Sequence, residues 1–442
     1  MNSGDTAWML VSTALVMLMT PGLALFYGGM VQQRNVLSTF MHSFFALGIV
    51  TVVWVVVGYS LAFAPDVGGG LVGGFDFAFF KGVGVDAAPN APTIPHIVYA
   101  LYQCMFAIIT PALISGAYAE RIKFSSYMLF TLLWSLLVYA PLAHWVWAPD
   151  GWLFKMGALD FAGGTVVHLS SGVSALVAAL VLGKRLGYPN VRHQPHNLTM
   201  TLIGAGLLWF GWFGFNGGSA LASNGLAGLA FGNTHIAAAV GALSWGFVEY
   251  LRIKKVTMLG VASGLVAGLV AITPAAGYVS PAAAMAIGLL AGVVCYGGVM
   301  LKARFGYDDA LDAFGVHGVG GMLGALLTGF FAEKVWNGAG NDGVLAGNGS
   351  LMIAQLAGIG AAAAFAGVLT WLLLKGIDLV IGLRVTSDEE REGLDTNLHG
   401  ESGYALGGAS GGHHITEHEH AAHGAAHRMN ATGAEPSTNP TA

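Results

Sequence analysis

The feature that most constrains this fold is a series of eleven long apolar runs. Each has about twenty residues or more, enough for a helix to cross the ~30 Å hydrocarbon core of a bilayer. Only 9% of the 442 residues are charged and 55% are hydrophobic, whereas soluble domains carry about 25% charged residues. The sequence therefore predicts an all-α polytopic membrane protein with eleven transmembrane helices. The runs cover approximately residues 7–31, 38–63, 94–119, 125–147, 163–183, 198–218, 226–250, 257–275, 279–301, 312–331 and 347–381.

Composition excludes several other classes of protein. The 66 glycines suit close helix packing within a membrane. A net charge of −5 with 18 basic residues argues against a nucleic-acid partner. Cys104 and Cys295 lie in apolar runs and form no metal-ligand pattern. The sequence has no phosphate-binding loop of the form Gly-x4-Gly-Lys-Ser/Thr, so nothing in it indicates an energy source.

Basic residues are divided unequally between the two sets of connecting loops. Because cytoplasmic loops carry the excess of Lys and Arg, we expect the N-terminus outside and the C-terminus in the cytoplasm of a multi-pass inner (plasma) membrane protein. The first run follows Asp5 without a basic leader, so we read it as a span rather than a signal peptide. The set of loops expected outside the cell holds only Lys81, Lys155 and Lys334. The richer set holds Arg34, Arg121, Lys123, Lys184, Arg185, Arg192, Arg252, Lys254, Lys255, Lys302 and Arg304.

Three regions differ in composition. Residues 1–384 form the expected transmembrane domain, and 385–405 form a charged cytoplasmic segment. Residues 406–442 are rich in His, Gly and Ala without apolar periodicity, so we expect a disordered tail. Its histidines either bind Zn or Ni weakly or belong to an unstructured extension; they are His413, His414, His418, His420, His423 and His427.

A short pattern recurs at a constant offset of 149 residues, where the fifth and tenth spans begin. An odd number of spans per repeat forces the two repeats to be inverted. We therefore predict two inverted five-helix repeats, spans 1–5 and 6–10, followed by a long eleventh helix. The matched residues are Asp160 and Asp309, Val167 and Val316, His168 and His317, and Gly172 and Gly321.

Helix geometry brings the two repeated histidines together. Eight residues at ~1.5 Å per residue carry each histidine ~12 Å into the bilayer from opposite sides. We expect His168 and His317 to lie next to each other near the midplane, largely neutral and sharing one hydrogen bond. Ionisable residues at this depth are functional candidates. The alternatives are core histidines bonded to carbonyls, or a metal site, for which two ligands are too few.

Five further positions have a functional and a structural interpretation. Asp160 either caps the fifth span or also favours an arriving cation. Trp147 and Ser219 end spans on the expected external side; they are an interfacial anchor and a turn cap, or together they hold a small cation. Phe106 and Phe215 either pack in the core or line a constriction that strips water.

Several segments resemble the Amt/Rh family of ammonium transporters, close to its bacterial Amt branch, across residues 5–405. The Asp160 segment is highly specific, whereas the glycine-rich ones alone are weak. The segments are Phe26-Tyr27-Gly28-Gly29-Met30, Ala119-Glu120-Arg121 with Lys123-Phe124, Asp160-Phe161-Ala162-Gly163-Gly164-Thr165-Val166-Val167-His168, Trp212-Phe213-Gly214-Phe215-Asn216 and Phe314-Gly315-Val316-His317-Gly318.

This resemblance implies a homotrimer with one narrow pore per subunit, and a transporter rather than an enzyme, without cofactor or metal. We expect ammonium to be recruited outside and deprotonated at the gate, and ammonia to pass the histidines, with or without the proton following. One alternative is an ammonium sensor; another is a membrane enzyme or metal transporter that uses the histidine pair. The implied residues are Trp147, Ser219 and Phe106 for ammonium binding with Asp160 in support, Phe106 and Phe215 for a stacked gate, and His168 and His317 for twin histidines of the pore and proton relay.

The charged segment after the last span also resembles the family. It is similar to the cytoplasmic segment that couples subunits and meets a PII-type signalling protein. Without the resemblance, it reads as a solvated charged strip. The His-rich stretch beyond it departs from the compact tail of the family. The matching positions are Arg384, Glu390, Gly393, Asp395 and His399.

Overall fold

The computed structural model describes residues 1–191 and 193–404. The His-rich tail and Arg192 therefore lie outside the described residues. Met1–Gly403 form one compact unit, and the second unit begins at Tyr404. The predicted cytoplasmic segment thus belongs, up to residue 403, to the same unit as the spans.

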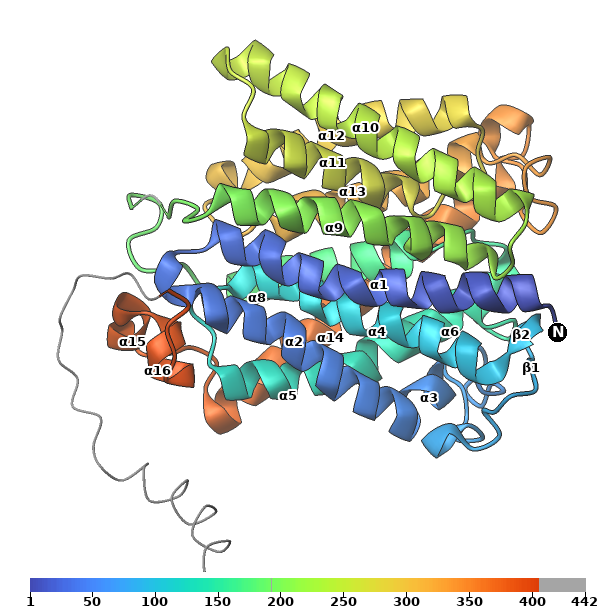
Figure 1. Ribbon diagram of the computed structural model, residues 1–442, viewed down its shortest axis with the longest axis horizontal. Helices are drawn as coiled ribbons and strands as arrows, with labels where there is room; N and C mark the ends of the chain where they lie inside the picture. Colours follow the sequence, from blue (N-terminus) through green and yellow to red (C-terminus); the bar gives the residue numbers. More distant parts are fainter. Residues whose placement is uncertain (192, 405–442) are drawn as a thin grey trace, which may run out of the picture. The chain divides into compact units, whose positions relative to one another are not determined.

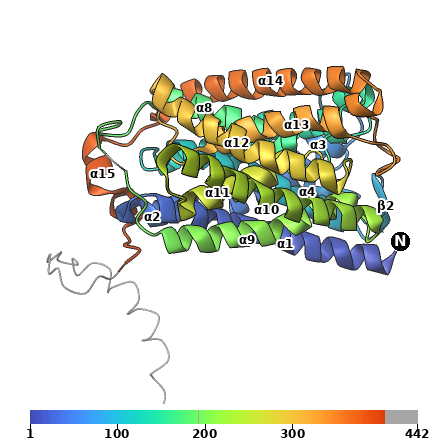
Figure 2. The ribbon, with the colours of Figure 1, turned by 90° about the horizontal axis from the view of Figure 1, so that it is seen from above.

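Long helices lying side by side build this unit (Figures 1 and 2). Four of them are continued by π-helical turns, η2 (Trp54–Gly58), η4 (Ser135–Tyr139), η5 (Gly164–Leu169) and η7 (Phe314–Gly318). The helices are α1 (Ser3–Met30), α2 (Val36–Val53), α3 (Tyr59–Phe63), α4 (His96–Tyr118), α5 (Phe124–Trp134), α6 (Ala140–Trp147), α7 (Trp152–Met156), α8 (Ser170–Leu182), α9 (Leu198–Gly217), α10 (Gly225–Ile253), α11 (Met258–Ile272), α12 (Pro281–Phe305), α13 (Val319–Phe331), α14 (Ser350–Ile381), α15 (Ser387–Glu392) and α16 (Leu394–His399).

The helices confirm the predicted membrane fold. Within the described residues, ten helical segments are long and apolar enough to cross a membrane. The shorter apolar helix α11 has 15 residues and occupies the position of the predicted eighth span. Two inverted five-helix repeats are followed by α14, the long eleventh helix, which has 32 residues. The apolar runs thus predicted where the spans lie.

Local sequence signals explain where individual helices begin and end. Ser280 accepts a hydrogen bond from the Ala283 amide at 3.2 Å and precedes Pro281, the first residue of α12. Ser280 is therefore the side-chain N-cap of α12. Proline is favoured at the first helical position, because the N–H group that it lacks would have no partner within the helix there. The helix ends at Gly306, whose φ of 71° favours glycine.

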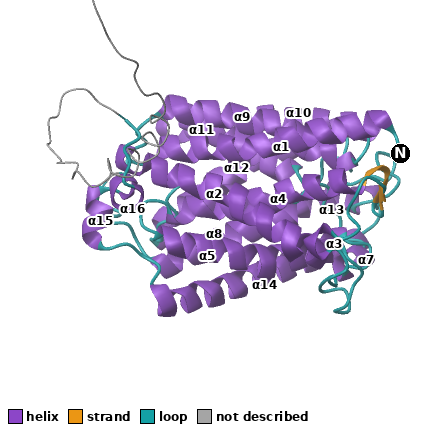
Figure 3. Cartoon of the chain, turned by 60° about the horizontal axis from the view of Figure 1, so that its bottom comes forward, coloured by secondary structure: helices purple, strands orange, loops and turns teal. Residues whose placement is uncertain are grey.

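The two ends of the bundle differ. The N-terminus and a small antiparallel hairpin, β1 (Ala87–Ala88) and β2 (Ala91–Pro95), lie at one end, which we call the N-terminal face (Figure 3). The short helices α15 and α16 lie at the opposite end, which we call the C-terminal face (Figure 1). The hairpin belongs to the connection between α3 and α4.

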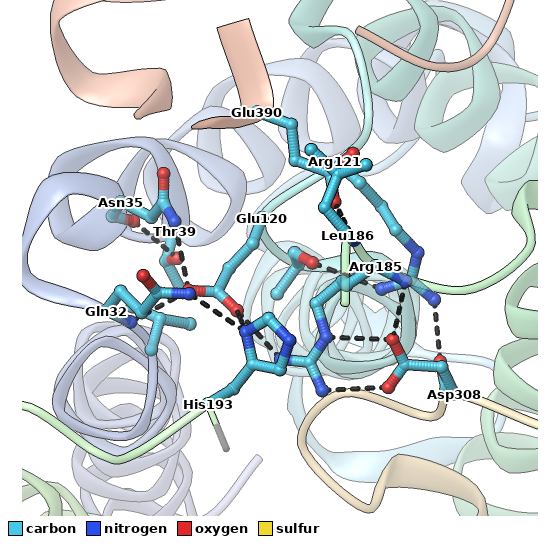
Figure 4. Close-up of polar contacts among 12 residues, drawn as sticks. Gln32, Asn35, Thr39, Glu120, Arg121, Arg185, Leu186, His193, Asp308 and Glu390 are labelled. Atoms are coloured by element: carbon cyan, nitrogen blue, oxygen red, sulfur yellow. Dashed lines mark hydrogen bonds and ion pairs between the residues drawn. The ribbon is translucent and has the colours of Figure 1, made fainter. Parts of the chain in front are cut away.

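A buried polar network holds the loops of the C-terminal face together (Figure 4). Arg185 makes two side-chain hydrogen bonds to Asp308, at 2.8 and 2.9 Å, and a third to Glu120 at 2.7 Å. Desolvation raises the pKa of Asp308, but the hydrogen bonds and charge of Arg185 outweigh it and lower this pKa to about 2. Since Asp308 follows α12 and the other two residues follow α4 and α8, the network joins the two repeats.

Candidate functional site

Three cavities follow one another through the bundle. An outer cavity of about 440 Å³ opens at the N-terminal face, and an inner cavity of about 200 Å³ lies toward the C-terminal face. Between them lies a narrow middle cavity of about 10 Å³. Phe106 lines the outer cavity, Phe215 and His168 line the middle one, and His317 lines both the middle and the inner one. The cavities are therefore larger toward the two ends of the bundle and smallest at its centre.

The outer cavity brings together three of the predicted site residues. Trp147 and Phe106 form an edge-to-face pair with ring centroids 5.9 Å apart. Ser219 lines the same cavity and donates its hydroxyl proton to the carbonyl oxygen of Phe215 at 2.8 Å. The lone pairs of the Ser219 hydroxyl therefore remain as acceptors beside two aromatic rings.

Tyr102 also lines this cavity, although it was not predicted as a site residue. Its hydroxyl lies 2.8 Å from the Phe215 carbonyl oxygen and 3.2 Å from the Ser219 hydroxyl. Its ring packs edge-to-face on Phe106 at 5.0 Å. The available signal was its spacing, because residues four apart on a helix share a face, and Tyr102 precedes Phe106 by four on α4.

Asp160 lies behind the cavity rather than in it. One carboxylate oxygen accepts hydrogen bonds from the amides of Gly163 and Gly164, at 2.8 and 2.6 Å, and the other accepts from Thr165 and Val166, at 2.8 and 3.1 Å. Four amides at the start of η5 therefore share one anion, which is the arrangement of a helix cap. The Asp160 carbonyl oxygen also accepts a hydrogen bond from the Trp147 indole at 2.9 Å.

Phe106 and Phe215 separate the outer cavity from the middle one. Their ring centroids are 4.2 Å apart and the ring planes differ by 30°. Both side chains are buried. The two rings therefore form an apolar barrier between the two cavities.

His168 and His317 lie next to each other in the middle cavity, with ring centroids 5.3 Å apart and planes 18° apart. Trp212 stacks on the other side of His168 at 5.3 Å. The expected hydrogen bond between the two imidazoles is wrong: within the described residues, neither nitrogen of His168 and not Nδ1 of His317 has a hydrogen-bond partner.

The lining of the middle cavity is otherwise apolar. Among the residues that the structure describes, no group of three or more His, Cys, Asp or Glu side chains could hold a metal ion. The remaining side chains that line the middle cavity are Met19, Leu23, Phe26, Ile109, Leu113, Leu208, Trp212, Phe215 and Val266. A cation in this cavity would meet no charged side chain of the lining.

The paired aspartates and glycines show why the repeat pattern recurs. Asp309 accepts hydrogen bonds from the Ala313 and Phe314 amides, at 3.1 and 2.8 Å, where the His317 turn begins. A Cβ atom on Gly172 would lie 2.0 Å from the Gly318 nitrogen. One on Gly321 would lie 2.7 Å from the Leu169 nitrogen, beside the other histidine. Each glycine therefore lets its helix approach the turn that carries the partner histidine.

The predicted tail residues contact the bundle at the C-terminal face. The Arg384 guanidinium donates to Glu390 at 2.6 Å, and Glu390 accepts the Leu186 amide at 2.7 Å. Asp395 accepts the Ser38 amide at 2.8 Å, which fastens α16 to α2. Glu390 and Asp395 are buried. The interpretation of this segment as a solvated strip is therefore wrong for these two residues.

The remaining two tail residues shape the same contact. Gly393 has a φ of 114°, in the region that favours glycine, and it separates α15 from α16. The amide of the next residue, Leu394, donates to Asn35 at 2.8 Å. The His399 ring packs edge-to-face on Phe124 with centroids 4.9 Å apart.

Comparison with known proteins gives consistent matches. The model of the Ammonium Transporter Family matches residues 7–404. The chain is similar to an ammonium transporter of Bacillus subtilis (strain 168), at 53% identity over 405 residues, covering 91% of this chain and 99% of the relative. Its structure resembles that of Saccharomyces cerevisiae Mep2, with a TM-score of 0.83 and 39% identity over 88% of each chain. It also resembles a protein described as Sensor Amt Protein, with a TM-score of 0.83 and 31% identity, over 89% of this chain and 98% of that one.

Proposed function

The chain belongs to the ammonium transporter family, and from this premise we propose the route by which it moves ammonium across a membrane. Ammonium binds in the outer cavity and loses a proton at the pair of phenylalanines. Ammonia then passes His168 and His317 and leaves through the inner cavity. The observation that carries this proposal is the middle cavity, which is narrow and apolar apart from two imidazoles.

Binding in the outer cavity uses the shape and charge of ammonium. The rings of Trp147 and Phe106 offer π faces to a cation, and the Ser219 hydroxyl offers an acceptor to one N–H group. We assign Asp160 a supporting role, because its carboxylate fixes the start of η5 and its carbonyl oxygen holds the Trp147 indole. Tyr102 supports Ser219 and Phe106 in the same way.

The middle cavity provides selectivity against metal cations. Potassium and ammonium are nearly the same size, so a pore radius alone does not separate them. Moving a bare cation into an apolar cavity carries a large desolvation penalty, whereas ammonia pays little. Potassium has no proton to lose, so the penalty remains for potassium alone. The unpartnered nitrogens of His168 can exchange a hydrogen bond with passing ammonia.

We also propose the orientation of the protein in the membrane, its oligomeric state and its partner. We place the N-terminal face outside and the C-terminal face in the cytoplasm of the inner (plasma) membrane, since basic residues gather in the loops of the latter. We propose a homotrimer, and a PII-type signalling protein as the partner of residues 384–399, where Glu390 and Asp395 attach α15 and α16 to the bundle.

Reconstituted vesicles on a solid-supported membrane test this proposal. We expect a pulse of ammonium to give a current or a pH change inside the vesicles, and an equal pulse of potassium to give none. Empty vesicles are the control. Equal responses to both cations would overturn the proposed selectivity, and the absence of any ammonium flux would overturn transport.

A sensor is the second candidate, and two observations favour keeping it. A structural neighbour is described as a sensor, and the tail segment of this chain contacts the loops that follow α1, α4 and α8. A pure sensor would bind ammonium in the outer cavity without flux through reconstituted vesicles. The flux measurement above therefore separates the two functions.

A further inference from the structure

A histidine outside the proposed path has both ring nitrogens next to acceptors. His144 lies in α6 and is fully buried. Its Nδ1 lies 3.0 Å from the carbonyl oxygen of Ala62 in α3, and its Nε2 lies 3.2 Å from a carboxylate oxygen of Asp66. A neutral imidazole carries one N–H and can donate only one of these hydrogen bonds. Both form only when the ring is doubly protonated.

Asp66 is the anion that would hold this charge. Its carboxylate also accepts a hydrogen bond from the Gly68 amide at 3.3 Å. Desolvation raises the pKa of Asp66, but hydrogen bonds from the Gly70 and Gly68 backbones and the contact with His144 lower it overall. At neutral pH the carboxyl is therefore ionised and has no proton to give to Nε2 of His144.

Other ionisable groups on the elements packed around α6 have different partners. Asp160 is bonded to four amides. Lys155 and Asp150 face each other at 3.9 Å, with side chains 61% and 57% exposed. Tyr59 of α3 bonds to His96 at 2.6 Å. Asp66 is thus the charged group that the described contacts place against His144.

The loop that carries Asp66 is fastened to the same helices. The indole of Trp145 in α6 donates to the Leu71 carbonyl oxygen at 2.8 Å. The Trp152 amide at the start of α7 donates to the Gly70 carbonyl oxygen at 3.2 Å. The loop therefore lies across the end of α6, and the contact between His144 and Asp66 is its charged attachment.

The last turn of α6 connects this contact to the outer cavity. The Ala148 amide donates to the His144 carbonyl oxygen at 3.2 Å, which closes the turn that contains Trp147. Trp147 lines the outer cavity and contacts Phe106. A displacement of His144 therefore moves the backbone that carries the Trp147 ring.

We propose that His144, held as an imidazolium between Asp66 and Ala62, is a positioning residue that fixes Trp147 in the ammonium site. The inference rests on the proposed role of Trp147 in ammonium binding. It makes the affinity of the site depend on an ion pair outside the transport path, in which the His144 ring is buried and the Asp66 side chain is 17% exposed. The pair acts on binding, since neither residue lines the middle cavity where passage is limited.

Three variants test the pair, His144→Gln, Asp66→Asn and the double variant. Asp66→Asn leaves the buried imidazolium of His144 without its anion, which is strongly unfavourable, and His144→Gln removes the ring that pairs with the partly exposed Asp66. Gln and Asn together form a neutral hydrogen-bonded pair. In vesicles we expect the ammonium KM to rise at least about fivefold in each single variant. We expect the maximal flux to stay near wild type and the KM of the double variant to return toward wild type.

Asp150→Asn is the matched control, because Asp150 is an aspartate of the same face with an exposed partner. Its KM should equal that of wild type. An unchanged KM in Asp66→Asn, or additive losses in the double variant, would overturn the inference. Size-exclusion chromatography in detergent identifies variants that fail to fold, and the double variant keeps the test decisive if a single variant is lost.

Solid-state NMR of protein with ¹⁵N-labelled histidine reads the charge directly, independently of flux. We expect an imidazolium signal at pH 7 that disappears in His144→Gln. If the signal that disappears is that of a neutral ring, the inference is wrong even when wild type transports ammonium. If wild type transports none, the proposed function fails while the NMR result stands on its own.

Discussion

His168 and His317 stack with ring centroids 5.3 Å apart, and neither nitrogen of His168 has a hydrogen-bond partner among the described residues. Buried polar atoms are normally hydrogen-bonded. Ring nitrogens without a partner inside a narrow cavity are therefore an exception, and they suit a site at which a ligand supplies the hydrogen bond. Passing ammonia or water would supply the missing contacts. In the function that we propose, these free nitrogens let the two histidines act as a relay, which passes a hydrogen bond or a proton along the path of ammonia.

Replacement of one ring tests this relay. His168→Ala removes the imidazole between Trp212 and His317 and widens the middle cavity. We expect the ammonium current either to fall at least about tenfold, equivalent to about 1.4 kcal/mol in the barrier, or to be joined by a potassium current. Solid-supported membrane recordings with each cation measure both. Unchanged flux and selectivity would contradict the relay.

Tyr102→Phe tests the support of the outer cavity. The change removes a hydroxyl bonded to the Phe215 carbonyl oxygen and to Ser219 while keeping the ring on Phe106. A typical hydrogen bond contributes about 0.5–1.5 kcal/mol, so we expect the ammonium KM to rise about two- to tenfold. Initial uptake rates at varied ammonium concentration measure it. Tyr99→Phe is the control, because Tyr99 lines the same cavity and its hydroxyl bonds to Gln103 instead. Equal KM values for the two variants would contradict the assignment.

The sequence predicted the spans and the histidine pair well, for a physical reason. Crossing a bilayer demands about twenty apolar residues, which leaves a long signal in one sequence. The spacing of Asp160 from His168, repeated in the second half, then located both histidines at matching depth. Because inverted repeats place equivalent positions face to face, their proximity followed from topology without any side-chain detail.

Features that depend on side-chain packing could not be predicted from the spacing of residues in the sequence. The π-helical turns η5 and η7 hold the histidines, but nothing in the residue pattern distinguishes a π turn from an α-helix. The same limit explains the wrong hydrogen bond, since ring orientation follows from the neighbours, Trp212 above all. Burial of Glu390 and Asp395 was also missed, because charged residues in a short polar segment read as solvated.

Gly172→Ala tests the close approach of the two repeats. The new Cβ atom would lie 2.0 Å from the Gly318 nitrogen, a backbone atom that has no freedom to rotate away. Overpacking of this kind destabilises by about 1–3 kcal/mol, so we expect a lower unfolding temperature in detergent. Gly360→Ala on α14 is the control, as nothing lies within 4 Å of its Cβ position. If both variants unfold at the wild-type temperature, the glycine does not set the helix approach.

The buried pair of Asp308 and Arg185 predicts an acid-dependent loss of stability. The folded-state pKa of Asp308 lies at about 2, below its ordinary value of 3.8. The ionised carboxylate therefore stabilises the fold at pH values above about 4, and this contribution is lost as pH falls from about 4 toward about 2. Removing one partner of a buried pair costs about 3–5 kcal/mol. We expect Asp308→Asn to unfold at lower temperature than wild type at pH 7, with the difference shrinking below pH 4.

Thermal unfolding in detergent between pH 3 and pH 7 measures that difference. Asp388→Asn is the matched control, because Asp388 pairs with Arg391 at 2.7 Å but both side chains are exposed, at 83% and 67%. Exposed pairs contribute about 0–1 kcal/mol, so this variant should follow wild type at every pH. A gap between Asp308→Asn and wild type that stays constant as pH falls would mean that the carboxylate charge is not what stabilises the network. In that case its oxygens alone would hold the loops of the two repeats together.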